Sequence, residues 1–312
     1  MGSYESGEFS LGYIDPSDVQ AKDLKQMMDF FYQSNYTTNS TYWMQGAIDK
    51  RFKVGDQQLY SAVYGQNSQN VQKYFFNLIR RHVNMICGFQ RRNRKSTTTL
   101  PNQEQTDGLA DDYNKTLRWC EDRDGFQEYQ SQAFEGAVDT GETMLHLYPD
   151  YTFDPVSGDL FTDSVQFNNY LIDQYTRKQD LSDCNGIWRR RWTSKEMAKS
   201  LIPGYSKEID KMKPGGMKDG RFPVQAELQN VAINNLFTYD EFYYRTTRKG
   251  KIIVDPYTGE AVEFEENILD PQMPHEEELR LILQQQPWLK VKETDIPTVK
   301  MVIALGGKTI YH

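Results

Sequence analysis

Cysteine and histidine are scarce in this sequence, and neither follows a pattern typical of disulfides or metal sites. The 312 residues include three cysteines and four histidines. The cysteines are far apart with no C-x-x-C pair, and no two histidines have the H-x-x-x-H spacing of a helical zinc site. A disulfide framework and a cysteine-based zinc site are therefore not expected, and we predict no cofactor.

Long apolar runs and an excess of positive charge are also missing. No segment approaches the ~18–20 consecutive apolar residues of a membrane span. The first residues, MGSYESGEFS, lack the basic and apolar regions of a secretory signal, so we expect a soluble chain with no membrane partner. Lys and Arg number 36 against 44 Asp and Glu, a net charge of −8. That balance excludes tight, nonspecific DNA binding by the whole surface.

The sequence lacks the short motifs of several common enzyme classes. It has no G-x-x-x-x-G-K-[ST], no G-x-S-x-G and no H-E-x-x-H. Asp173, Asp180 and Asp183 cluster around a loop, as the ligands of a metal-dependent nuclease would. Acidic loops are more often solvated turns, and we therefore predict that the chain is not an enzyme. A metal-dependent nucleic-acid hydrolase that uses these three aspartates is the alternative.

Aromatic residues are abundant, and the apolar patterning predicts an α+β fold. The 20 Tyr and 16 Phe argue against intrinsic disorder. Helical periodicity predicts helices over Asp18–Gln33, Ser68–Gly88, Thr106–Trp119 and Phe126–Val138, with a polar connection over Ser34–Thr41. Strands are expected over Glu142–Tyr148, Val165–Ile172, Gly186–Trp192, Leu236–Thr247, Lys251–Val254, Ala261–Phe264, Leu289–Glu293, Thr298–Leu305 and Lys308–Tyr311. Hydrophobic content of 38% suggests that subunit contacts supply part of the stability.

Two basic segments are candidate interfaces. The helix over Ser68–Gly88 carries an apolar stripe that we expect to be buried, with His82 as a core histidine. Arg91, Arg92, Arg94 and Lys95 follow it. They are either a solvated segment that favours the helix dipole or a contact with phosphate or with a partner's carboxylates. We predict a subunit or capsid contact.

The second candidate interface is Arg189, Arg190 and Arg191, within a predicted strand. Strand alternation sends Arg190 to the opposite face from its two neighbours. These arginines are either a clamp for an acidic partner or part of an exposed or interface strand. Trp188 and Trp192 in the same strand are expected to be core or interface aromatics.

Four segments, in order, resemble the portal proteins of short-tailed phages, of the crAss-like type. Asn77–Arg94 is similar to the family's helix ending in G-[FY]-x-R-x-N-R, and Gln130–Tyr148 to its S-x-A-F-x-x-A-V helix-to-strand pattern. Tyr170–Pro203 resembles the D-x-S-D-A element. The last segment comprises Tyr239–Tyr244, the Asp255–Glu260 hairpin, the helix over His275–Gln286 and the strand over Thr298–Leu305. Glu142 and Cys184 stand where the family usually has Gly and Ala.

The resemblance implies a dodecameric ring in the virion, at one capsid vertex, assembled in the host cytoplasm. Its partners would be a terminase motor, a neck or adaptor protein, the major capsid protein, and double-stranded DNA held weakly in the channel. The implied domains are an N-terminal arm (1–16), a wing (17–270), a stem helix (271–287) and the start of a clip (288–312). Because the chain ends in mid-strand, we expect the N-terminal part of a longer subunit. Another virion neck or structural protein is a further alternative.

Overall fold

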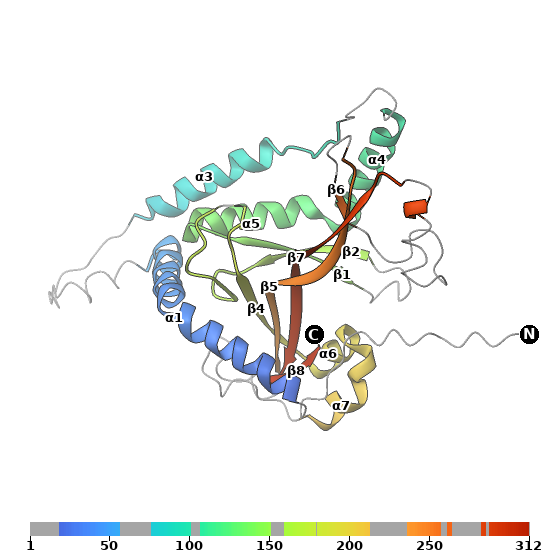
Figure 1. Ribbon diagram of the computed structural model, residues 1–312. Coiled ribbons are helices and arrows are strands. Elements are labelled where there is room, and N and C mark those ends of the chain that lie inside the picture. Colours follow the sequence, from blue (N-terminus) through green and yellow to red (C-terminus); the bar gives the residue numbers. More distant parts are fainter. Residues whose placement is uncertain are drawn as a thin grey trace, which may run out of the picture. The chain divides into compact units, whose positions relative to one another are not determined.

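The computed structural model describes residues 19–56, 76–100, 107–150, 159–178, 180–212, 236–256, 261–263, 282–284 and 287–311. The chain divides into two compact units, one formed by Met1–Phe242 with Val302–His312 and the other by Tyr243–Met301. Helices and antiparallel strands together make up the structure, which confirms the predicted α+β class (Figure 1).

Helices dominate the first half of the larger unit. They are α1 (Val19–Val54), α3 (Leu78–Arg92), α4 (Asp107–Asp124) and α5 (Phe126–Thr140), followed later by α6 (Lys195–Leu201), η2 (Pro203–Tyr205) and α7 (Ser206–Lys211). Helix α5 contacts α1, α3 and α4 and is thus the common support of the group. It ends as predicted, because Gly141 adopts a positive φ of 93° and donates its N–H to the Ala137 carbonyl.

Helix α1 is longer than the sequence pattern predicts. The polar connection expected over Ser34–Thr41 is wrong, since the helix continues without a break to Val54. The side chain of Asn39 hydrogen-bonds both the carbonyl and the N–H of Ile172, at 3.0 and 3.3 Å. Asn35 accepts the N–H of Gln174 at 2.8 Å. The polar residues of this stretch therefore belong to a helix that faces a strand, where their amides find backbone partners.

Helix α3 begins at the cap residue Asn77, whose side chain accepts the Arg80 N–H at 3.0 Å. Residues 68–75 of the predicted helix lie outside the described residues, as does the predicted N-terminal arm. Of the predicted stem helix, residues 282–284 and 287 are described, and 282–284 are helical. The sequence Thr193-Ser194-Lys195-Glu196 has the form of a capping box, in which Thr193 would be the cap. In the structure Ser194 caps α6 by accepting the Met197 N–H, so the helix begins one residue later than a Thr193 cap would give.

The described strands form two sheets. A hairpin pairs β1 (Met144–Asp150) with β2 (Asp159–Val165). The larger sheet has the order β3-β4-β5-β7-β8, with β6 paired to β5. Its strands are β3 (Tyr170–Ile172), β4 (Gly186–Thr193), β5 (Phe237–Val254), β6 (Ala261–Glu263), β7 (Lys290–Leu305) and β8 (Lys308–Tyr311). Strand β3 therefore lies at one end of this order.

Three strand predictions need correction. The single strand expected over Val165–Ile172 is interrupted by a turn in which Asn169 donates its N–H to Gln166. Strands β5 and β7 each run unbroken where two separate strands were expected. The second part of β5 and the first part of β7 contain no buried residue, so neither carries the in–out hydropathy alternation that marks a half-buried strand.

Aromatic side chains join α1 to the larger sheet. Trp188, Tyr170 and Phe242 are almost fully buried, which confirms Trp188 as a core residue. Phe31 of α1 packs on Phe242 with ring centroids 4.9 Å apart, and Tyr32 meets the edge of Trp188 at 5.9 Å. These contacts hold α1 against β4 and β5 through the buried rings of Trp188 and Phe242.

Candidate assembly surface and neighbouring sites

The outer face of α3 is apolar and exposed. Leu78, Met85 and Phe89 are 57%, 65% and 71% exposed and share one face because they recur at helical spacing. Ile79 and Ile86 flank them and are also exposed. The prediction of a buried stripe is confirmed at Val83 but is wrong for Leu78, Ile79 and Ile86; the other buried residue of the helix is Cys87.

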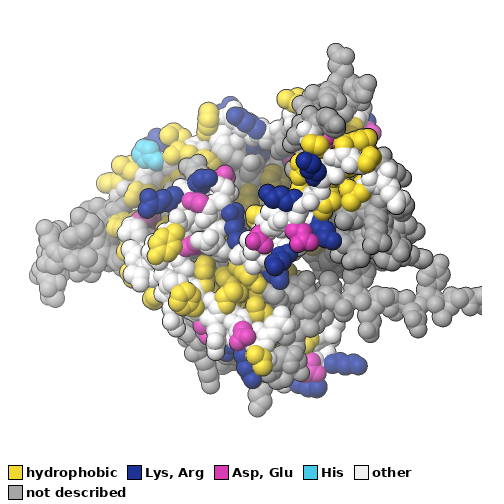
Figure 2. Space-filling view, viewed as in Figure 1, with side chains coloured by type: hydrophobic (Ala, Val, Ile, Leu, Met, Phe, Trp, Pro, Cys, Tyr) yellow, Lys and Arg dark blue, Asp and Glu magenta, His cyan; other side chains and the backbone are white. Residues whose placement is uncertain are grey.

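His82 lies on the same exposed face of α3. The prediction that it is a core histidine is therefore also wrong. Its Nδ1 lies 2.8 Å from the Leu78 carbonyl oxygen of its own helix. Figure 2 shows hydrophobic and basic side chains side by side at the upper left, where α3 lies in Figure 1. An exposed apolar helix face of this kind is typical of a protein–protein contact.

The basic segment at the end of α3 divides into two groups. Arg94 donates to Ser131 at 2.9 Å and pairs with Glu128 at 3.3 Å, and Arg91 lies 3.7 Å from Glu135. These carboxylates belong to α5 of the same chain. Arg92 and Lys95 are exposed, and among the described residues no carboxylate lies within ion-pair distance of either. The inner arginines therefore hold α3 on α5, while the outer basic residues face solvent.

A second ion-pair cluster fixes the end of α1 beneath α3. Lys53 Nζ lies 2.7 Å from Glu135 and 2.6 Å from Asp139, both on α5. Cys87 of α3 is buried nearby, and this burial raises the pKa of its thiol. The inner side of α3 is thus occupied by contacts within the chain.

Of the three arginines of β4, Arg189 and Arg190 are buried and Arg191 is partly exposed. Arg190 forms a two-pronged pair with Asp240 of β5, with Nε–Oδ1 at 2.6 Å and Nη2–Oδ2 at 2.9 Å. Both side chains are 2% exposed. A bidentate pair in such a buried place fixes the register of the two side chains as well as their charge.

Arg189 and Arg191 point to the other face of β4, as strand alternation predicts. Arg189 Nη1 donates to His146 Nδ1 at 2.7 Å and lies 3.3 Å from Glu241. Arg191 lies 4.5 Å from the centroid of the Tyr239 ring. Burial, and then the charge of Arg189, lowers the pKa of His146. The partners of these arginines come from β1, β2 and β5 of the same chain.

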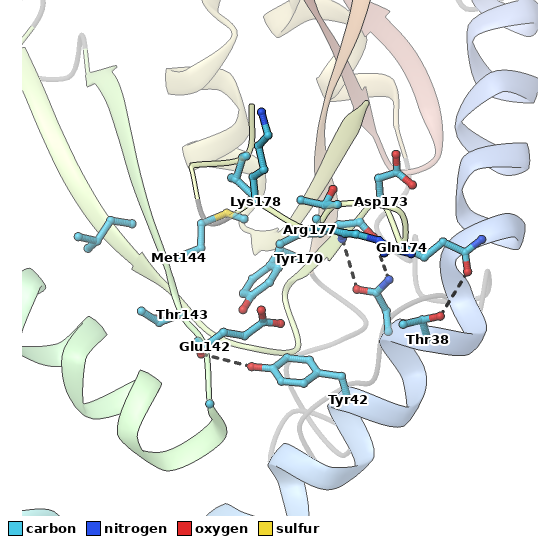
Figure 3. A pocket seen from close by; sticks show the side chains of 16 residues that line it. Thr38, Tyr42, Glu142, Thr143, Met144, Tyr170, Asp173, Gln174, Arg177 and Lys178 are labelled. Atoms are coloured by element: carbon cyan, nitrogen blue, oxygen red, sulfur yellow. Dashed lines mark hydrogen bonds between the residues drawn. The ribbon is translucent and has the colours of Figure 1, made fainter. Parts of the chain in front are cut away.

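A cavity of about 780 Å³ opens between α1, the start of β1 and the β3–β4 loop (Figure 3). Tyr42 donates its hydroxyl to the Glu142 carbonyl at 3.3 Å, and the Tyr42 and Tyr170 side chains point toward Glu142. Partial burial raises the pKa of the Glu142 carboxyl, and burial raises that of Tyr170. The polar groups of Tyr42, Glu142 and Tyr170 therefore lie together in one part of the cavity lining.

The aspartates considered as metal ligands stabilise the loop beside this cavity. Asp173 accepts from Asn185 Nδ2 at 2.8 Å, and Asp180 accepts the Ser182 N–H at 3.1 Å. Asp183 accepts the Arg177 N–H at 2.9 Å, the first of the hydrogen bonds that lower its pKa. Within the described ranges no group of His, Cys, Asp and Glu is placed to hold a metal ion. These carboxylates act as loop caps, and the hydrolase hypothesis gains no support.

Among the described helices, none combines the length and apolar character needed to cross a bilayer. The exposed apolar and basic face of α3 is typical of a surface that contacts another protein. The model of the phage P22-like portal protein family matches residues 31–312. The chain belongs to this family, which confirms the resemblance to portal proteins, the head–tail connectors of bacteriophage virions. No curated protein matches the sequence.

Proposed function

We propose that this chain is a subunit of a dodecameric ring at the unique capsid vertex. The ring is the channel for genome packaging and ejection, and it docks the terminase motor and, later, neck or adaptor proteins. The family match over residues 31–312 is the observation that carries the proposal. The exposed apolar face of α3 supports it, since a ring subunit must cover such surfaces with its neighbours.

The charge of the chain suits a passage for DNA. Strong pairing with phosphates would arrest a sliding duplex, and affinity of that kind grows with the number of neutralised phosphates. A chain of net charge −8 is compatible with double-stranded DNA that is held weakly while a separate motor supplies the work. In this proposal the chain has no catalytic role.

The finer assignments are also proposals. They comprise the crAss-like type, the N-terminal part of a longer subunit, assembly in the host cytoplasm, and a contact with the major capsid protein. The wing would extend over residues 17–270, the stem helix over 271–287 and the start of the clip over 288–312. Their support is the order of the four sequence segments, which extends along most of the chain.

Imaging of the purified gene product at its natural length tests the proposal. Mass photometry and negative-stain microscopy should show a closed ring, with twelve subunits by mass. A persistent monomer or dimer across the accessible concentration range would refute the ring. Divalent-cation-dependent DNA cleavage that disappears in an Asp180→Ala variant would instead favour the hydrolase.

A further inference from the structure

Helix α4 presents a second exposed apolar surface on the same chain. Ala110 is its buried hydrophobic residue, whereas Leu109, Tyr113 and Leu117 are 57%, 56% and 36% exposed. Their spacing of four residues places them along one side of the helix. We call this row the α4 seam. An 18-residue helix with so little buried surface gains little from its own chain, since most helical stability in proteins comes from packing.

The charges of α3 and α4 are opposite. Helix α3 carries four arginines and no acidic residue, a charge of +4. Helix α4 carries six acidic residues against three basic ones, a charge of −3. On α3, the row Leu78, Arg81, Met85, Phe89 and Arg92 recurs at intervals of three or four residues and so forms one face, which we call the α3 seam.

We propose that the α3 seam of one subunit docks on the α4 seam of the next copy of this chain. This inference rests on the ring proposed above and names the surfaces that close it. Each seam offers exposed apolar side chains, and the arginines of the α3 seam meet a helix with an excess of carboxylates. Opposite net charges on these two helices of one chain favour a head-to-tail contact, because each helix then meets one of opposite charge on the neighbour.

The contacts among the described residues involve other sides of α3 and α4 than the two seams. On α3, Val83 and Cys87 are buried and Arg91 pairs with Glu135 of α5, and α4 also contacts α5. A docked capsid or neck protein of either charge would suit one seam and be repelled by the other. A second copy of the chain satisfies both at once, and this complementarity decides the choice of occupant.

Disulfide trapping between differently tagged chains tests the pairing. One chain carries Met85→Cys and the other Tyr113→Cys, both with Cys120→Ser because Cys120 lies on α4. Mixed rings under mild oxidation should give a heterodimer band at least tenfold stronger than either variant alone. Phe89→Cys, one turn further along the α3 seam, repeats the test at a second position.

The outcomes separate the inference from the portal function. Rings that form normally but give no cross-link from Met85→Cys or Phe89→Cys to Tyr113→Cys overturn the pairing of α3 with α4 and leave the ring intact. Rings in which Met85→Cys chains cross-link to each other show a symmetric α3 contact and also overturn it. Absence of rings from the unmodified protein refutes the proposed function itself, and the inference with it.

Discussion

The arginines of β4 and those of α3 show the same residue type in two opposite settings. Arg190 is 2% exposed and held by both oxygens of Asp240, whereas Arg92 is exposed and faces solvent. A buried guanidinium must have its carboxylate within the same chain, or folding would leave an unpaired charge. A guanidinium at the surface needs no carboxylate partner, because water solvates its charge. The difference separates arginines that determine the fold from arginines available to another molecule.

Breaking the buried Arg190–Asp240 pair should have the largest effect on stability. Arg190→Met leaves Asp240 buried without its guanidinium, and we expect a loss of about 3–5 kcal/mol in the free energy of unfolding. Urea unfolding followed by circular dichroism measures it. The double variant Arg190→Met with Asp240→Leu should recover most of the loss, because no charge is then stranded. A single variant within 1 kcal/mol of the unmodified protein would break the distinction drawn here.

Two helical glycines sharpen the same contrast between interior and surface. A Cβ at Gly46 of α1 would lie 2.8 Å from the Phe167 ring, whereas a Cβ at Gly88 of α3 would meet nothing within 4 Å. Gly46→Ala should therefore cost about 1–3 kcal/mol through overpacking. Gly88→Ala should stabilise the chain by about 0.5–1 kcal/mol, the usual gain of Ala over Gly in a helix. Equal effects in urea unfolding would contradict the packing observed around Gly46.

The buried cluster of β4 should also make stability depend on pH. Burial lowers the pKa of His146 in the folded chain, so the unfolded chain binds its proton first as the pH falls. The stability contributed by neutral His146 is complete above pH ~6.5 and declines as the pH drops below that value. Unfolding free energies at pH 8 and pH 5.5 measure this. The decline should be smaller in His146→Gln, and an unchanged decline would assign it to other groups.

Reversing charge at the end of α3 should change monomer stability least. Arg92→Glu with Lys95→Glu reverses two exposed charges that have no ion-pair partner among the described residues, and stability effects of about 0.5 kcal/mol are usual for such surface changes. Assembly should nevertheless be impaired, with at least tenfold more protein needed for half-maximal ring formation. Lys22→Glu with Lys25→Glu on exposed positions of α1 is the matched control with the same charge change. If both double variants assemble alike, the α3 end is not at a contact.

The sequence was sufficient to predict those helices and strands that are determined by signals within their own residues. Helix α5 and strand β4 follow their expected spans within a few residues, because periodicity and a positive-φ glycine act locally. The capping serine of α6 is a local signal of the same kind. The alternation that separates Arg190 from its neighbours is likewise a property of any strand.

Other features depend on partners that lie far away in the chain. Asn35 and Asn39 resemble a connection in sequence, and their helical role is set by a strand more than 130 residues later. The apolar stripe of α3 predicts a buried face, but periodicity cannot say whether burial occurs inside the subunit or against a neighbour. The carboxylates that pair with Arg189 and Arg190 are equally remote in sequence, so the arginine triplet alone could not distinguish an interior cluster from an interface.

The contact of Asn39 with Ile172 has a consequence for many copies gathered in one place. Strand β3 is an edge strand of the larger sheet as described. The outward N–H and C=O groups of an edge strand can pair with a strand of another chain. The Asn39 amide occupies both of those groups at Ile172, and Asn35 occupies the next N–H at Gln174. Asn35 and Asn39 of α1 thus block the addition of a further strand at the β3 edge of the sheet. They protect crowded subunits against aggregation by strand addition at this edge.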